Sequence, residues 1–396
     1  MMSASASCTT TGPRGVCAAP VTTEAEGKHE VNEQRDGARQ GRDTERTGAD
    51  ERPSSAGPAE IGQQPCPCGS GRTFVDCCGS AQNTDGDTTA RQVSHEIEQR
   101  LQEGDFADEA EVQSFLDDFM AERNSRGIDD FDGLSPNQMR ALLNEPFESA
   151  PLDGLERRLP ADIDAPILAL FRIIADAARE RGIKLTARGN LPLKLVKVAD
   201  AWLREDGGLP DRESIRVSTE PDVREFHHVR LVAELAGLLR KSRGYLYLTR
   251  RAEKMLDQDD WPALYGRLFR TFARRFNWAY SDGFHELAIA QHSFGFTLHL
   301  LHRHGGEWRP AAFYEDWFLR AFPMALEGAS EGIMGLDPER RTRLAWSLRT
   351  FHGFGYLCGL VELGGEDSPP PIMPDLGLKV RATPLLGRVF PHAPPA

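Results

Sequence analysis

Apolar side chains recur at helical spacing through most of the chain after residue 94. The first clear example spans residues 110–126, where one face of the expected helix carries Val112, Phe115, Leu116 and Phe119. Positions i, i+3, i+4 and i+7 lie on the same side of an α-helix. This stripe therefore predicts an amphipathic helix that packs against a core.

A shorter helix is predicted directly after it, with both ends marked by the sequence. Ser135 is suited to the N-cap and Pro136 to the first helical position, because the N–H that proline lacks is not needed there. Pro146 disfavours helical geometry in the residue before it, so the helix is expected to end at that point.

A pattern of long helix, short apolar run, threonine and second helix occurs three times after residue 160. The three stretches are 166–203, 222–256 and 340–390. In each, a threonine follows the apolar run, where its hydroxyl can cap the next helix; the three are Thr186, Thr249 and Thr383. Repetition of one supersecondary unit is therefore expected in this part of the chain.

The middle stretch contains the clearest strand signal. Two apolar runs flank Ser242, Arg243 and Gly244, which predicts a β-hairpin over residues 237–248. Helix, hairpin and helix follow one another in this way in a winged helix-turn-helix. We therefore expect a mainly α fold with short winged-helix-like strand elements.

Composition divides the chain into five segments. Residues 1–63 are poor in aromatic and branched apolar side chains, so a disordered leader is expected there. A second polar run predicts a linker at 81–93, and the cysteine-rich residues 64–80 lie between leader and linker. A helical segment is expected at 94–160 and a helical domain with winged-helix-like repeats at 161–396.

Charge and apolar content limit the class of protein. The chain has 396 residues, 40% of them hydrophobic, and a formal charge of −13. This permits a sizeable core and argues against a surface that generally attracts nucleic acid. No run approaches the ~20 apolar residues of a membrane-spanning helix, and the first residues lack the features of a secretory signal. A cytoplasmic protein is expected.

Four of the seven cysteines fall between Cys66 and Cys78. Thiolates crowded in this way in a reducing compartment are more often metal ligands than disulfide partners. Gly69 and Gly71 permit the sharp turn that would bring two cysteine pairs to one ion, and Pro67 stiffens the first pair. The stretch therefore predicts a zinc knuckle.

At residues 64–79 the chain resembles the SEC-C motif, which is found at the C-terminus of the preprotein translocase ATPase. Cys-Pro-Cys-Gly-Ser-Gly and Cys-Cys-Gly, with Arg72 and Phe74 between them, match the motif position by position. The resemblance implies one Zn²⁺ held by Cys66, Cys68, Cys77 and Cys78. Four protein ligands leave no open position for substrate, so a catalytic zinc is not expected. The resemblance also implies a protein partner, such as a chaperone or a ribosome-associated protein.

A second part of the chain is similar to uncharacterised bacterial proteins carried on plasmids and mobile elements. Residues 185–192 and 238–249 carry this likeness. It implies no activity.

The predicted hairpin is basic. Arg240, Lys241 and Arg243 would lie near its tip, with Tyr245 and Tyr247 beside them. Such side chains are suited to contact phosphates, which supply most non-specific affinity for nucleic acid. A DNA-binding regulator of a mobile element is therefore one hypothesis, and a solvated face on a helical scaffold is its alternative.

Histidines between residues 285 and 302 raise the question of a second metal site. His285, His292 and His299 are seven residues apart on one helical stripe, with His302 one turn beyond. Seven residues span about 10.5 Å of helix, so only His299 and His302 would be close enough to share an ion. Histidines packed in a core or interface are preferred over a metal-dependent hydrolase or transferase.

Other enzyme signatures are missing from the sequence. It has no Walker-type phosphate loop, dinucleotide fingerprint, nucleophile elbow or metalloprotease helix. Cys8, Cys17 and Cys358 are too scattered for a disulfide framework and are expected to be free thiols. We therefore expect a zinc-binding, non-catalytic adaptor with no catalytic residue to assign; the DNA-binding regulator and the metal-dependent enzyme are the alternatives.

Overall fold

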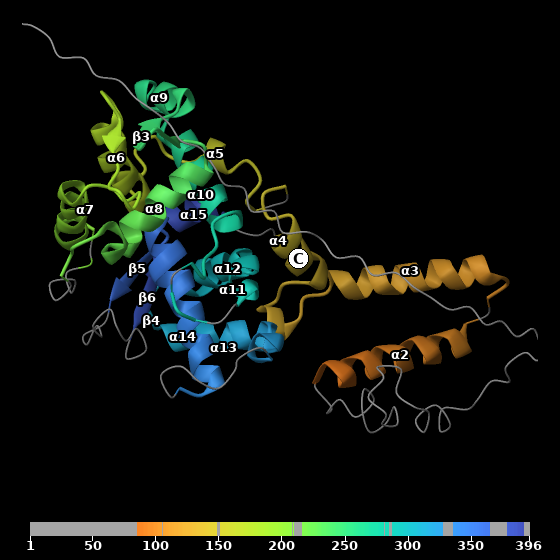
Figure 1. Cartoon of the computed structure of the whole chain (residues 1–396). Helices are drawn as coiled ribbons and strands as arrows, with labels where there is room; N and C mark the ends of the chain where they lie inside the picture. Colours follow the sequence, from red (N-terminus) through yellow and green to blue (C-terminus); the bar gives the residue numbers. More distant parts are fainter. Residues whose placement is uncertain are drawn as a thin grey trace, which may run out of the picture. The chain divides into compact units, whose positions relative to one another are not determined.

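The computed structural model describes most of the chain from residue 85 onward. The described ranges are 85–104, 106–148, 151–207, 209, 216–280, 282–284, 287–327, 336–364 and 378–391. The chain divides into two compact units, residues 1–92 and 93–396. The prediction of a mainly α fold with short antiparallel strands is confirmed (Figure 1). Within the described ranges, no helix is long and apolar enough to cross a membrane.

The first helices among the described residues are α2 (Asp85–Glu103), α3 (Glu109–Ser125) and α4 (Pro136–Asn144). The two helices predicted in this region are confirmed as α3 and α4. Asp108 caps α3 by accepting a hydrogen bond from the N–H of Glu111, and Ser135 and Gln138 form a capping box at the start of α4. Local side-chain chemistry therefore sets where both helices begin.

Helix α2 covers residues 85–93 of the segment predicted as a linker. The polar composition indicated a linker, but most residues from Ala90 onward are good helix formers. Glu96 and Arg100 form an ion pair one turn apart, with 3.2 Å between their side chains. The helix-forming residues from Ala90 onward and the ion pair just beyond the segment favour one continuous helix despite its few apolar residues.

A first three-stranded sheet follows, within a set of seven elements that we call the first copy. They are α6 (Pro166–Ala178), β1 (Ile183–Lys184), α7 (Leu193–Glu205), α8 (Arg224–Leu235), β2 (Leu239–Ser242), β3 (Tyr245–Leu248) and α9 (Arg250–Asp257). Strand β3 lies between β1 and β2 and is antiparallel to both. Arg243 and Gly244 have φ of 49° and 77°, so the predicted hairpin is confirmed with a two-residue turn.

A second three-stranded sheet belongs to the second copy, which has the same element order. Its elements are α12 (Phe294–His304), β4 (Arg309–Pro310), α13 (Ala311–Ala321), α14 (Pro338–Ser347) continued by the π-helix η7 (Leu348–Gly355), β5 (Val361–Gly364), β6 (Lys379–Ala382) and α15 (Pro384–Val389). Strand β6 lies between β4 and β5, which is the place of β3 in the first copy.

The two copies also share their strand register. Leu246 of β3 lies opposite Ile183 of β1, and Val380 of β6 lies opposite Arg309 of β4 at the corresponding position. In both sheets the outer strand of the hairpin pairs four residues with the central strand. The likeness therefore extends from element order to individual residue pairs.

A hydrogen bond from a threonine to a glycine links the end of the last two strands to their beginning in each copy. The hydroxyl of Thr249 donates to the carbonyl oxygen of Gly237 at 2.9 Å, and that of Thr383 donates to Gly359 at 2.6 Å. Thr186, the third predicted threonine, instead accepts a hydrogen bond from the N–H of Asn190. Thr186 closes the loop after β1. The stretches that contain Thr249 and Thr383 are therefore equivalent, and the one that contains Thr186 is not.

One hydrophobic core runs through both copies and the helices around them. The remaining elements are α5 (Leu155–Arg158), α10 (Trp261–Arg274), α11 (Ala288–His292), η2 (Asp129–Phe131), η4 (Glu220–Asp222) and η5 (Pro323–Leu326). Leu142 and Leu155 belong to the same core as Phe269 of α10 and Phe390, so a boundary at residue 160 does not separate two cores. Helices α8 and α10 lie between the two sheets in Figure 1.

Candidate functional site

The predicted zinc ligands Cys66, Cys68, Cys77 and Cys78 lie outside the described residues, so their assignment stays a prediction. In the ranges that the structure covers, no group of three or more histidine, cysteine, aspartate or glutamate side chains is placed to hold a metal ion. Cys358 is described, buried and free, as expected. Burial raises the pKa of its thiol well above the ordinary value, so the reactive thiolate form is disfavoured.

The hairpin of β2 and β3 carries the three basic residues predicted to contact nucleic acid. The guanidinium of Arg240 lies over the ring of Tyr247, 4.9 Å from its centroid. Lys241 Nζ is 3.1 Å from the carboxylate of Glu234 on α8, whereas Arg243 is exposed at the turn. The charge of Lys241 is therefore compensated within the fold.

The predicted histidine stripe does not assemble into one site in the described residues. His285 lies outside them, and His292 is exposed at the end of α11. His299 is buried on α12, whereas His302 lies beside the ring of Phe390, with 6.2 Å between the ring centroids. His299 and His302 therefore face different surroundings.

Asp132, which no sequence motif marks, lies beside two histidines. Its carboxylate is 2.9 Å from His304 Nε2 and 3.3 Å from His299 Nε2, and Arg303 is 3.8 Å away. Burial raises the pKa of Asp132, but the hydrogen bonds to the two histidines and the charge of Arg303 outweigh it and lower the pKa below its ordinary value. The cluster anchors the loop before α4 to α12.

A second buried carboxylate, Glu220, joins the turn η4 to α8. It is 2.8 Å from His227 Nδ1, accepts the backbone N–H of Leu191 at 2.5 Å and pairs with Arg230. Burial raises the pKa of Glu220, but His227, Arg230 and the Leu191 N–H together lower it below its ordinary value. Arg230 also pairs with Glu234, which continues the network to the hairpin.

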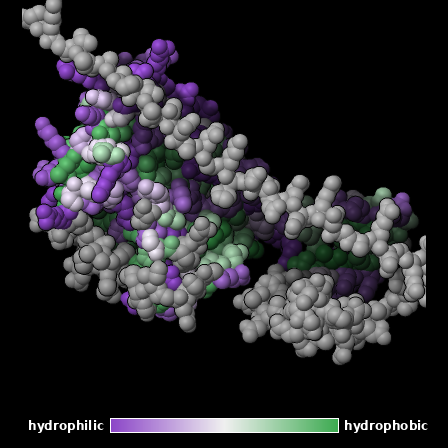
Figure 2. Space-filling model, in the orientation of Figure 1, coloured by the Kyte–Doolittle hydropathy of each residue, from purple (hydrophilic) through white to green (hydrophobic). Residues whose placement is uncertain are grey.

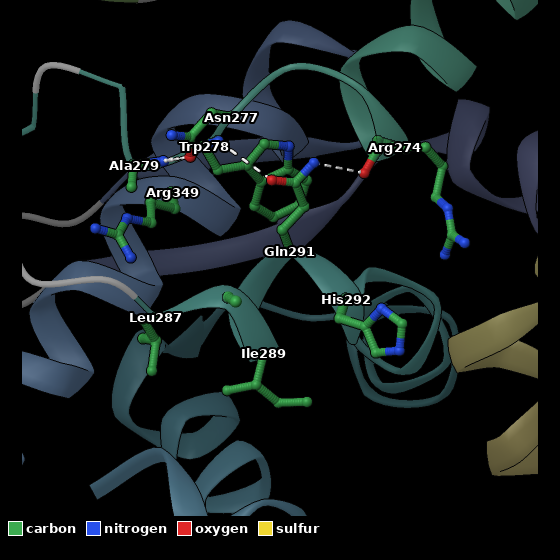
Figure 3. Close-up of a pocket in the computed structure, with 11 residues that line it drawn as sticks. Arg274, Asn277, Trp278, Ala279, Leu287, Ile289, Gln291, His292 and Arg349 are labelled. Carbon is green, nitrogen blue, oxygen red and sulfur yellow. Dashed lines mark hydrogen bonds between the residues drawn. The ribbon is translucent and has the colours of Figure 1, made fainter. Parts of the chain in front are cut away.

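A cavity of about 650 Å³ opens beside α10 and α11 (Figure 3). Its wall includes Trp278, Leu287 and Ile289. The side-chain amide of Gln291 is hydrogen-bonded to the backbone. Its oxygen accepts from the N–H of Trp278 at 3.2 Å, and its nitrogen donates to the carbonyl oxygens of Ala273 and Phe276. The cavity thus has a partly apolar wall, and the amide of Gln291 is already hydrogen-bonded within the protein.

Arg349 of this cavity is also bonded within the structure. Arg349 forms a buried two-bond ion pair with Asp282, at 2.6 and 3.2 Å. Burial and the nearby charge of Arg274 lower the pKa of His292. The described lining has no serine, cysteine, aspartate or glutamate, and His292 is its one histidine.

Comparison with known protein families places the SEC-C motif at residues 64–80. The predicted resemblance of this stretch is therefore confirmed. No curated protein and no solved structure matches the chain. The similarity to plasmid-borne and mobile-element proteins stays a prediction.

Proposed function

We propose that this protein is a zinc-binding adaptor, which recruits another protein through its SEC-C motif and catalyses no reaction. The observation that carries the proposal is the family match over residues 64–80, which contain four of the seven cysteines. The reduced thiols that such a motif needs agree with a place in the cytoplasm.

The four cysteines Cys66, Cys68, Cys77 and Cys78 would hold the ion. Thiolates suit Zn²⁺ in a tetrahedral site, with sulfurs about 2.3 Å from the metal. A metal ion with four protein ligands has no position left for water or substrate. Zinc would therefore order the motif as a binding surface, and the motif would depend on metal for its fold.

The described part of residues 93–396, which we call the body, supports the role of a scaffold. Its buried charges are paired within the structure, as at Glu220 with Arg230 and at Asp282 with Arg349. The cavity beside α10 presents no catalytic pair among its described lining residues. By the resemblance to the translocase tail, the partner would be a chaperone or a ribosome-associated protein.

Metal analysis combined with affinity capture tests this proposal. The full chain is compared with a Cys77→Ser, Cys78→Ser variant and with a Cys8→Ser, Cys17→Ser control, which removes two thiols outside the motif. We expect one zinc per chain in the wild type and the control, little in the motif variant, and loss of captured partners only in the motif variant. Metal-free wild-type protein, or the same partners on all three baits, would reject the proposal.

Nucleic-acid binding through the hairpin is a second candidate function, favoured by the element order of the first copy. Helix, strand, helix, helix and a final hairpin occur in this order in winged-helix domains. The third helix, which would enter the major groove, is α8, and most of it is buried, including Phe226, Val229 and Val232. Contact would therefore be made with phosphates by the hairpin and not with bases by α8.

Replacing Arg240, Lys241 and Arg243 by Gln tests this candidate. We expect weaker DNA binding and a shallower dependence of affinity on salt, since each phosphate contact releases counterions. Because Lys241 pairs with Glu234, the double variant of Arg240 and Arg243 is expected to show most of the loss. Affinity that does not change with salt would remove the candidate.

A further inference from the structure

Helix α10 and its C-cap residue supply three arginines to one groove. The groove has a volume of about 300 Å³ and is lined by Arg267, Arg270, Arg275, Glu156, Met255, Ala263 and Thr271. Three guanidinium groups against one carboxylate leave two positive charges uncompensated among these residues. This is unusual in a chain whose formal charge is −13.

The guanidinium groups are held in place by the fold. Arg267 Nε donates to the carbonyl oxygen of Ala236, and Arg275 Nη1 donates to that of Leu235 at 2.8 Å. Arg270 binds both carboxylate oxygens of Glu156, at 2.8 and 3.0 Å. The bonds of Arg267 and Arg275 each use one of three side-chain nitrogens, so the others remain to bind a ligand.

Positive charge continues from the groove toward α9. Burial and the charges of Arg251 and Arg275 lower the pKa of Arg267. Cations gathered in this way repel one another, and an anion in the groove would relieve that repulsion. Arg251 is exposed on α9, which directly follows the hairpin with Arg240 and Arg243. Figure 2 shows hydrophilic side chains over α9 at the top of the view.

We propose that this groove binds the phosphate backbone of a nucleic acid. Fixed guanidinium forks suit phosphate because they form two parallel hydrogen bonds to it. The lining residues include no aromatic ring on which a base would stack, which favours the backbone as the ligand. The inference rests on the second candidate function, but it places the main phosphate contact on α10 and not on the hairpin.

The proposal is tested by measuring how tightly the full-length protein binds a fluorescent DNA duplex. The salt concentration is varied between about 50 and 200 mM, a range over which phosphate contacts change the affinity about tenfold or more. The groove variant is Arg267→Gln, Arg275→Gln. The control is Arg181→Gln, Arg188→Gln, which removes the same charge from exposed positions outside the groove. We expect the groove variant to bind at least about tenfold more weakly, with a salt slope smaller by about two, and the control to bind like the wild type.

A second variant, Ala263→Glu, keeps all arginines and guards against misfolding of the first. Ala263 is the third residue of α10, a position at which glutamate is favoured. Its N–H donates to the side chain of Asp260, the N-cap residue. The new carboxylate would lie in the groove and repel phosphate, so we expect weaker binding with unchanged circular dichroism.

The outcomes separate this inference from the second candidate function. Wild-type protein that binds no DNA at low salt would overturn both. Loss of binding in the hairpin variant, with full binding in the groove variants, would overturn the groove alone. Binding to vesicles of anionic phospholipid without binding to DNA would also overturn it, since the ligand would then be a membrane surface.

Discussion

Gly237 and Gly359 show how a single backbone position limits the choice of residue. They occupy equivalent places after α8 and η7 and have φ of 68° and 69°, where other residues are strained. Their surroundings differ. A Cβ added at Gly237 would meet Arg267 at 3.7 Å, whereas one added at Gly359 would meet the Cβ of Ala165 at 3.0 Å. The first site has room for a methyl group and the second does not.

Alanine at the two sites should therefore have unequal effects. We expect Gly237→Ala to lower the free energy of unfolding by about 1 kcal/mol, from backbone strain. Gly359→Ala should cost about 2–3 kcal/mol, because overpacking adds to the same strain. Urea unfolding of the two variants beside the wild type measures the difference, and equal losses would contradict the close contact with Ala165.

At the residue scale, local chemistry was predictable and buried charge was not. The cap at Ser135 and the turn at Arg243 depend on neighbours within a few residues, which a sequence displays directly. Asp132 meets His304 from 172 residues away, and Glu220 meets Leu191 from 29 residues away. Such pairings exist only after the chain has folded.

At the scale of elements, Glu220 holds α8 to the turn before it. Glu220→Ala would take from buried Arg230 one of its two carboxylate partners and leave the Leu191 N–H without its acceptor, so we expect a loss of about 3–5 kcal/mol in the free energy of unfolding. Glu234→Ala is the control, because Glu234 is the more exposed partner of Arg230 and should cost less. Chemical denaturation at neutral pH measures both.

The same carboxylate gives a pH dependence with a definite sign. The pKa of Glu220 in the folded protein lies below its ordinary value of 4.5. Its contribution is therefore present above about pH 4.5 and is lost as the pH falls through the folded pKa. The stability lost in Glu220→Ala, relative to the wild type, should be smaller in acid than at pH 7. A loss that grows in acid would contradict this.

Helix α8 also carries a buried histidine that should weaken the fold in mild acid. Burial lowers the pKa of His228 from 6.5 to about 3, and its Nε2 has no hydrogen-bond partner among the described residues. Because the unfolded chain binds a proton below pH 6.5 and the folded one does not, stability falls as the pH drops from 6.5. His352 on η7, with a pKa lowered to about 4, acts in the same direction.

Between pH 7.5 and 5.0, His228 alone should cost about 2 kcal/mol of the free energy of unfolding. We expect His228→Gln to remove roughly that much of the pH dependence, because glutamine does not titrate. Urea unfolding at the two pH values measures the effect above the range where carboxylates dominate. An unchanged dependence in the variant would show that His228 is protonated in the folded protein.

At the scale of the whole molecule, the helical class followed from hydrophobic spacing, but the repeated order of elements was only partly visible in the sequence. Three stretches share the local pattern of helix, apolar run and threonine, and the strand pairing and threonine hydrogen bonds of the structure show that two of them are equivalent. The boundary expected at residue 160 stays a prediction, although one hydrophobic core includes residues on both sides of it. Helix ends are local features, whereas a shared core joins Leu142 to Phe390 across the sequence.

Metal removal should affect the two compact units differently. The hydrophobic core of residues 93–396 contains none of the four predicted zinc ligands. We expect a strong chelator to release zinc and expose thiols of the SEC-C motif while the far-ultraviolet circular dichroism of the body barely changes. Cys358 serves as the internal control, since its buried thiol should stay unreactive until the body unfolds. Broad loss of helix on chelation would contradict this independence.

The shared register of the two copies has a consequence for biosynthesis. A central strand of one copy presents its backbone groups in the geometry that the outer strands of the other require, so crossed pairing is a hazard of the architecture. During translation the N-terminal copy leaves the ribosome first and can complete its own sheet before a competitor exists. A chain diluted from denaturant has both copies available at once. We therefore expect some refolded molecules in which strands of one copy pair with the sheet of the other.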